Sequence, residues 1–241
     1  MKSTAEALRK RGLPEQADLD RLKDTPYDTL IDLINSPLAA ERTAAVRVLA
    51  ARNPLDERFV RAILGRLCHE ESLYTKLEIC TALEQGDVAV ARLMALYLGR
   101  IGQNRHRTVP DRVSKKVSFP LPRDIVARSL GRMSPAVLPA LLEVLDDAEP
   151  QAVSEVLDAI GYMVFYHSEL ATAGNTARLL AVAHTVETND LLLWKAVLCL
   201  SAFPRAEVLA LLERIIATHP NTTIQNEAVR SIRLIRSRKG G

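Results

Sequence analysis

Basic side chains gather in one part of the chain, between Arg105 and Arg123. Six of them lie within these nineteen residues, together with one histidine and one phenylalanine. Guanidinium and ammonium groups bind phosphates or carboxylates by charge pairing, and arginine can add two parallel hydrogen bonds to one anionic group. The chemistry available here is therefore recognition of an anionic ligand or an acidic surface. The candidate binding residues are Arg105, His106, Arg107, Arg112, Lys115, Lys116 and Arg123.

The stretch that carries these side chains cannot continue as one helix. Residues 103–122 contain Pro110, Pro120 and Pro122, and proline lacks the amide N–H that an interior helical position donates. We expect a loop inserted between two helices. One alternative is a solvated insertion whose charges only keep it in water. The ending Ser118-Phe119-Pro120-Leu121-Pro122 favours a docked loop, because it combines extended backbone with two apolar side chains.

The net charge of +3 is unevenly distributed along the chain. Residues 103–122 carry five basic side chains and Asp111, a local charge of +4, and residues 230–241 carry five basic side chains and no acid. The remainder is therefore acidic, with a charge of −6. We interpret the C-terminal run as structural, because cations near a helix C-terminus complement the negative end of the helix dipole.

The sequence lacks the common motifs of nucleotide binding and catalysis. It contains no G-x-x-x-x-G-K-[ST], no G-x-G-x-x-G, no G-x-S-x-G and no H-E-x-x-H. Its five histidines are too widely spaced to form a metal site on one helix. We therefore predict no catalytic residue, no metal and no cofactor.

The cysteine pattern and the hydropathy of the chain indicate the cellular compartment in which the protein is expected. Cys68, Cys80 and Cys199 are scattered through apolar runs without a C-x-x-C pair, as expected for buried thiols in a reducing cytoplasm. No run approaches the ~18 apolar residues that span a membrane. The N-terminal residues also lack the apolar segment of a secretory signal. We predict a cytoplasmic protein without a membrane partner.

Helices must position the basic stretch. Apolar residues make up 48% of the chain but aromatic residues only 4%, a balance that favours closely packed helices over sheets. Helix start signals recur at Thr25-Pro26, Ser36-Pro37 and Ser134-Pro135. Each is followed by apolar residues three and four positions apart. The pattern predicts an all-α protein.

A similar helical segment recurs along the chain. Its anchor residues advance by 34, 47, 30, 40 and 32 positions, a period typical of stacked helical hairpins. The long second step contains the basic loop, which therefore interrupts the third of about six hairpins. The anchors are Leu49, Leu83, Leu130, Ile160, Leu200 and Ile232, and the first helices of the hairpins are predicted at residues 27–35, 56–67, 88–101, 136–145, 173–187 and 206–217.

The predicted hairpins are apolar on more than one face, so neighbours must stack to bury them. We expect an N-terminal helical cap and turn at residues 1–24, one α-solenoid domain at residues 25–237 with the insertion loop at 103–122, and a tail at residues 238–241.

Residues 137–161, VLPALLEVLDDAEPQAVSEVLDAIG, resemble a HEAT repeat. The resemblance extends more weakly over residues 25–237, and it implies an α-solenoid of the HEAT-like or armadillo type with a binding or scaffolding role. One departure is Val153-Ser154, where the family often has Val-Arg. The matching features are Leu-Pro and Leu-Leu in the first helix, Asp-Asp at the turn, Pro150, and Val153, Leu157 and Ile160-Gly161 in the second helix.

These observations leave three hypotheses for function. The first is a non-enzymatic scaffold that recognises a protein partner on its solenoid surface with help from the basic loop. The second is binding of nucleic acid or another polyanion, which predicts an affinity that falls steeply with salt. The third is a HEAT-like DNA glycosylase, which holds extruded bases against several aromatic rings. We interpret Trp194 as core and Tyr162, Phe165 and Tyr166 as packing residues, so this third hypothesis is the weakest.

Overall fold

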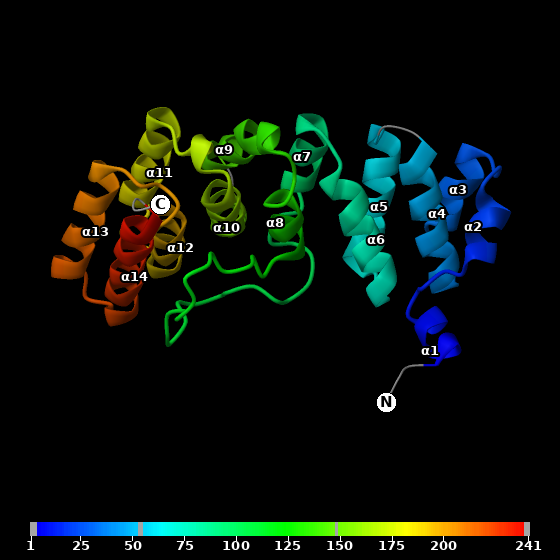
Figure 1. Cartoon of the computed structure of the whole chain (residues 1–241), viewed down its shortest axis with the longest axis horizontal. Coiled ribbons are helices and arrows are strands. Elements are labelled where there is room, and N and C mark those ends of the chain that lie inside the picture. The colour runs from blue at the N-terminus through cyan, green and yellow to red at the C-terminus, as the bar shows by residue number, and fades with distance from the viewer. Residues whose placement is uncertain (1–3, 53–54, 148, 239–241) are drawn as a thin grey trace.

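The fold was determined as a computed structural model that describes residues 4–52, 55–147 and 149–238. Within these ranges the chain forms fourteen α-helices and two short 3-10 helices, and no strand. Figure 1 shows the helices side by side in one curved array. The predicted all-α solenoid is confirmed.

Six helical hairpins follow one another along the array, and the two helices of each hairpin pack together. The first helices are α3 (Tyr27–Leu33), α5 (Glu57–His69), α7 (Val88–Ala95), α9 (Leu138–Asp147), α11 (Ala173–Thr185) and α13 (Ala206–Thr218). The second helices are α4 (Ala39–Arg52), α6 (Leu73–Glu84), α8 (Ile125–Leu130), α10 (Pro150–Tyr166), α12 (Asp190–Leu200) and α14 (Thr222–Arg238). The short helices η1 (Pro135–Val137) and η2 (Ser168–Leu170) precede α9 and follow α10.

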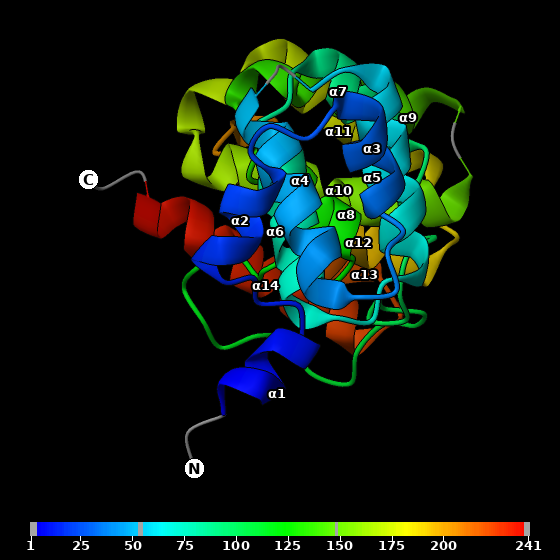
Figure 2. The same cartoon turned by 90° about the vertical axis from the view of Figure 1, so that its right-hand side faces the viewer.

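The second helices form the inner row of the array. Successive second helices pack against one another from α4 to α14. Among the first helices α5 packs on α7 and α7 on α9, whereas α9, α11 and α13 make few contacts with one another. The first helices of the last three hairpins therefore splay apart, which places them on the outside of the curve. Figure 2 views the array end on, and at the near end α2, α4 and α6 lie on one side of α3 and α5.

Two further helices precede the first hairpin. They are α1 (Ala5–Lys10) and α2 (Gln16–Leu22), and α2 packs against α4 in line with the inner row. A capping box at Glu15 and Asp18 begins α2, and Arg9 donates to both carboxylate oxygens of Asp18. The domain boundary near residue 24 stays a prediction. Residues 239–241 of the predicted tail lie outside the described part of the chain.

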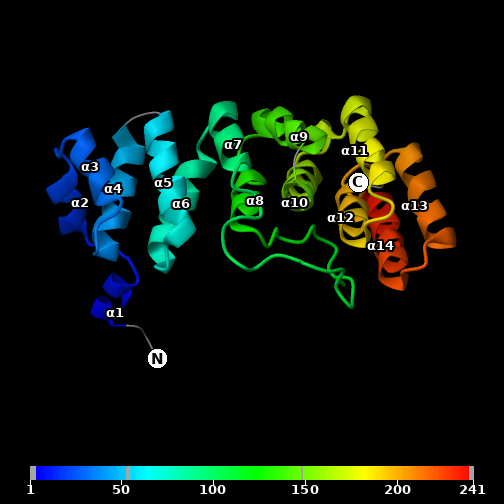
Figure 3. The same ribbon diagram turned by 180° about the vertical axis from the view of Figure 1, so that it is seen from behind.

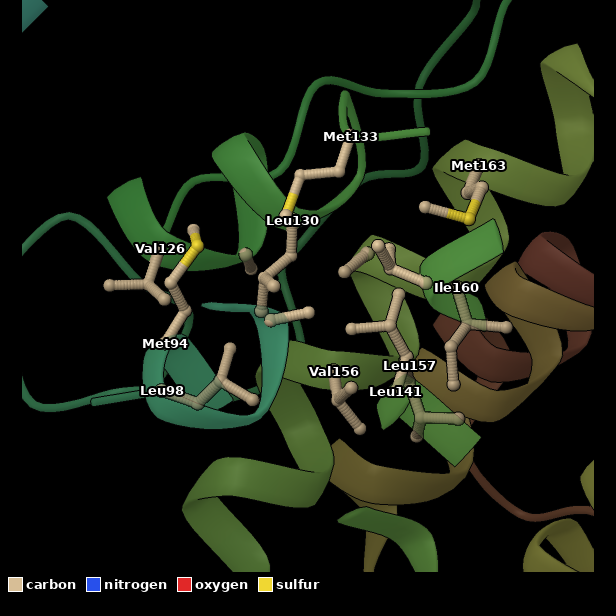
Figure 4. Packing of buried hydrophobic residues seen from close by; sticks show 14 of the residues in the cluster. Met94, Leu98, Val126, Leu130, Met133, Leu141, Val156, Leu157, Ile160 and Met163 are labelled. Atoms are coloured by element: carbon tan, nitrogen blue, oxygen red, sulfur yellow. The ribbon is translucent and has the colours of Figure 1, made fainter. Parts of the chain in front are cut away.

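The middle of the array shows how the hairpins share one core. Figure 4 shows Met94 and Leu98 meeting side chains of α8, while Leu141 packs against α10. Leu157 and Ile160 of α10 are fully buried, because α10 is flanked by helices of its own and both neighbouring hairpins. Replacing such a side chain with alanine typically costs about 2–5 kcal/mol.

Polar contacts that repeat at the hairpin period fix the inner helices relative to one another. The Thr43 hydroxyl lies 2.9 Å from that of Thr75, linking α4 to α6. The Ser231 hydroxyl donates to the Val197 carbonyl at 3.1 Å, linking α14 to α12. Buried hydrogen bonds depend strongly on geometry, so these pairs favour one alignment of neighbouring helices.

Helix α7 differs from its predicted bounds. The sequence predicted a helix at residues 88–101, but α7 ends at Ala95 and the chain continues in tight turns. Gly99 and Gly102 have φ angles of +71° and +75°, a conformation that a continuing helix cannot contain. The chain therefore leaves the helix before the basic loop begins.

A buried ion pair joins the first two hairpins. Arg42 of α4 donates from Nε and Nη2 to the two carboxylate oxygens of Glu70, both at 2.8 Å. Glu70 also accepts from Arg66 and from the Ser72 amide. Burial alone would raise the pKa of Glu70, but these donors outweigh it and hold the pKa at about 2.

This pair predicts a specific dependence of stability on pH. Because the folded pKa of Glu70 lies below its unfolded value, the ionised carboxylate stabilises the fold above about pH 4.5, and this contribution is lost between about pH 4.5 and pH 2. We expect Glu70→Gln to lower the free energy of unfolding by about 3 kcal/mol at pH 7, measured by urea denaturation. The difference from the wild type should shrink at pH 3. Glu57→Gln, in an exposed pair, is the control and should change stability by under about 1 kcal/mol. A difference that does not vary with pH would contradict this account of Glu70.

Candidate binding site

The basic loop crosses the concave side of the array. In Figures 1 and 3 it leaves α7, passes beneath α8 and α10 toward α14, and returns to α8. Asp124 holds the base of the loop together, because one of its oxygens accepts from the Gly99 amide at 3.2 Å and the other from the Ala127 amide at 2.8 Å. The Gln151 side chain donates to the Gly99 carbonyl. The loop therefore begins and ends at a fixed point of the third hairpin.

Phe119 is the apolar anchor of the loop. It is only 3% exposed, and its ring centroid lies 6.4 Å from that of Tyr162 and 5.7 Å from that of Phe165. It fits against α10 at Gly161, where an added β-carbon would overlap the Phe119 ring and crowd the backbone of Cys199. The interpretation of Tyr162 and Phe165 as packing residues agrees with this contact. Tyr166 differs, because it is 53% exposed and lies at the edge of the cluster, with its ring centroid 4.9 Å from that of Tyr162.

Arg230 is the polar anchor. It belongs to α14 and is 1% exposed, and its Nη2 donates to the carbonyl oxygens of Lys116 and Ser118 at 3.1 and 3.0 Å. Its Nη1 donates to Glu227 at 2.8 Å. The sequence interpretation gave Arg230 a role at the end of the last helix, whereas the structure shows it holding the loop.

A third contact is aromatic. The ring of His106 meets Trp194 of α12 edge on, with 4.8 Å between centroids, and the Trp194 indole N–H donates to Glu227 at 3.3 Å. Burial, followed by the nearby charges of Lys195 and Arg123, lowers the pKa of His106 to about 4. His106 is therefore neutral at pH 7, and Trp194 is buried as the sequence indicated.

The structure divides the candidate residues into three groups. His106, Arg112 and Arg123 line a cavity of about 230 Å³ between the loop and the inner helices. Arg105 and Arg107 line a second cavity of about 360 Å³ on the other side of His106. Lys115 and Lys116 line neither of these. The side chains of Arg107, Arg112, Lys115, Lys116 and Arg123 are exposed, and those of Arg105 and His106 are half-buried.

The two cavities have buried ionisable groups that sequence reasoning missed. Glu155 and Asp158 of α10 are 0% and 6% exposed, and both lie against the fully buried ammonium of Lys195 of α12. Glu155 lines the larger cavity, and Asp158 and Glu227 line the smaller one. Burial raises the pKa of Glu155 to about 7, although Lys195 opposes the shift. The signal in the sequence was the presence of charged residues inside apolar runs, two in SEVLDAIG and one in LLLWKAVLCL.

Within the described residues, no three histidine, cysteine, aspartate or glutamate side chains come together as ligands for a metal ion. Nor does any helix there combine the length and the apolar character needed to cross a membrane.

Comparisons with known proteins give distant similarities. No protein-family model matches the chain, and no curated protein does so. Two crystal structures of engineered proteins are similar to it, at 17% identity over 88% of this chain and 96% of the other (TM-score 0.42), and at 14% identity over 88% and 99% (TM-score 0.37). Designed armadillo repeat proteins for modular peptide recognition are similar at 15% identity over 95% and 92% of the two chains, with a TM-score of 0.38. The likeness to HEAT repeats therefore stays a resemblance.

The contact between Phe119 and Gly161 gives a test of loop docking. In Gly161→Ala the new methyl group displaces the Phe119 ring, so we expect a loss of about 1–3 kcal/mol in stability. We also expect faster cleavage by trypsin after Arg112, Lys115 and Lys116. The measurement is limited proteolysis with mass spectrometry.

Gly65→Ala is the matched control for this substitution. Gly65 lies inside α5, and no atom lies within 4 Å of the point that a β-carbon would occupy there. Alanine at this position should therefore add about 0.5–1 kcal/mol of stability and leave the loop protected. A loop that is equally resistant to trypsin in Gly161→Ala and in the wild type would rule out Phe119 as its anchor.

Proposed function

We propose that this chain is a non-enzymatic cytoplasmic binding protein that recognises an acidic surface of a protein partner. The observation that carries the proposal is the way the loop is held. Its backbone and Phe119 are fixed on the inner helices, while Arg107, Arg112, Lys115 and Lys116 remain exposed. A loop ordered before binding loses less conformational freedom on association than a mobile one, and its charges are presented in a fixed arrangement.

Exposed apolar side chains on the inner helix α6 and on the loop favour a protein partner over nucleic acid. Leu73 and Leu77 of the inner helix α6 are 41% and 53% exposed, and Val117 and Leu121 of the loop are 79% and 43% exposed. Protein interfaces combine apolar residues and arginine, whereas nucleic-acid interfaces are more polar and more positively charged.

The C-terminal basic run offers less free charge than its sequence indicates. Arg230 is hydrogen-bonded to the backbone of the loop. Arg238 donates to the Phe165 carbonyl at 2.8 Å, and its guanidinium lies 4.2 Å from the centre of the Phe165 ring. A polyanion would therefore meet fewer available cations in this run. The absence of nucleotide-binding and hydrolase motifs from the sequence supports a binding role, and a HEAT-like repeat domain at residues 25–237 is part of the proposal.

The test is affinity purification from nuclease-treated lysate of the source cells, with recovered proteins quantified by mass spectrometry. We expect Arg107→Glu, Lys115→Glu and Lys116→Glu combined to reduce recovery of the main partner at least tenfold, because an acidic surface is then repelled. The control is Arg233→Glu with Arg236→Glu, which changes exposed charge on α14 instead of on the loop.

Two results would contradict the proposal. Equal recovery of the same proteins by the wild type and the loop variant would remove the loop from the binding surface. Recovery that disappears after nuclease treatment, together with binding of the purified chain to an oligonucleotide that weakens steeply between 50 and 200 mM salt, would favour nucleic acid.

A further inference from the structure

The cavity of about 230 Å³ under the loop has the chemistry of a small-molecule site. The loop forms one wall and the inner helices α10, α12 and α14 form the other. Its volume exceeds the ~150 Å³ of an engineered cavity that holds benzene and is below that of most drug-sized sites. The ligand it suits is therefore small.

The floor of this cavity has an acceptor without a donor. One carboxylate oxygen of Asp158 pairs with Lys195, but within the described residues its other oxygen, Oδ1, has no hydrogen-bond partner. Glu227 lies beside it and is 1% exposed, with each oxygen accepting one hydrogen bond. A carboxylate oxygen accepts up to two, so both residues can receive a further donor.

The buried charges around the floor lie close together. The carboxyl groups of Glu155, Asp158 and Glu227 lie near two buried cations, Lys195 and Arg230, and burial raises the pKa of Glu155 to about 7 and also raises that of Glu227. His106 adds no positive charge, because its low pKa keeps it neutral at pH 7. A cationic group on a ligand would favour the ionised form of these carboxyl groups.

The rim of the cavity carries positive charge. Arg112 and Arg123 both line it and are exposed, and neither forms an ion pair with any described residue. Between floor and rim the walls are largely apolar, with Val113, Leu121 and Leu198 among them. A ligand that satisfies both ends carries a positive charge at one end and a negative charge at the other, on a body that tolerates apolar surroundings.

We propose that this cavity binds a small zwitterion of the amino-acid class. Its ammonium group donates to Asp158 and Glu227, and its carboxylate pairs with Arg112 and Arg123 at the rim. His106 and Trp194 enclose its body. The proposal goes beyond recognition of a protein partner and does not rest on it, because Asp158, Glu227 and Trp194 lie beneath the loop and the two sites share only the exposed Arg112.

The first test uses the purified full chain and the twenty free amino acids in a thermal unfolding assay. At ten times the Kd, one amino acid or a group of similar ones should raise the Tm by roughly 3–6 °C. Calorimetric titration then compares the strongest binder with its matched amine, which lacks the carboxylate, and its matched acid, which lacks the amine. Each analogue should bind at least tenfold more weakly, since each loses one charged contact.

Substitutions place the ligand in the cavity. Asp158→Asn keeps the shape of the cavity floor but removes the charge of this side chain. It should weaken ligand binding at least tenfold. Arg112→Ala alters only an exposed side chain, so the fold is retained, and it should weaken binding by roughly threefold to tenfold. Arg233→Ala, on the exposed side of α14, is the control and should bind like the wild type.

Three outcomes would overturn the assignment. They are a Tm unchanged by all twenty amino acids at 10 mM, binding of the matched acid as tightly as the amino acid, and binding that survives both Asp158→Asn and Arg112→Ala. Stabilisation by nucleoside monophosphates in place of amino acids would also overturn it in favour of a different ligand class. None of these outcomes depends on whether a protein partner is recovered with the exposed face of the loop.

Discussion

The structure depends on the burial of inner helices between their neighbours. Every residue of α12 from Leu192 to Leu200 is buried, including Lys195, which no single hairpin could accomplish. Each inner helix therefore obtains its stability from the helices before and after it, as in other repeat arrays. The same packing stabilises the buried charge of Lys195, because its ammonium group pairs with Glu155 and Asp158 of the preceding inner helix.

The loop packs on the side of this array that the outer helices leave uncovered. It docks on α10, α12 and α14 through Phe119, His106 and the carbonyls that Arg230 binds. The concave side is thereby divided into two parts. The C-terminal part is roofed by the loop and contains the two cavities, whereas α6 in the N-terminal part keeps exposed leucines.

Much of the fold could be predicted from the sequence because the hairpin signals are local. Helix caps, proline and apolar spacing act within a few residues, so both the repeat period and the insertion at residues 103–122 were visible. The docking of the loop was also indicated by Phe119 and its flanking prolines. Where it docks was not, because the contact of Arg230 with Lys116 joins residues 114 positions apart. No periodic pattern encodes such a contact.

The buried charges were missed for a related reason. On a surface helix Glu155, Asp158 and Glu227 would be ordinary solvated residues, and only the approach of α12, α14 and the loop buries them. Likewise, Arg230 belongs to a basic run whose position at a helix end offers a local explanation. In each case the local explanation was sufficient and the tertiary contact changed the role of the side chain.

The central claim is that the basic loop is a fixed part of the inner face, and one measurement tests it most directly. In a nuclear Overhauser spectrum of the purified chain, the ring protons of Phe119 should show strong cross-peaks to the α-protons of Gly161, which they contact in this structure. Cross-peaks of this pair are predicted at neutral pH without any ligand. Their absence, with the Phe119 ring protons at the shifts of an unfolded peptide, would contradict the account.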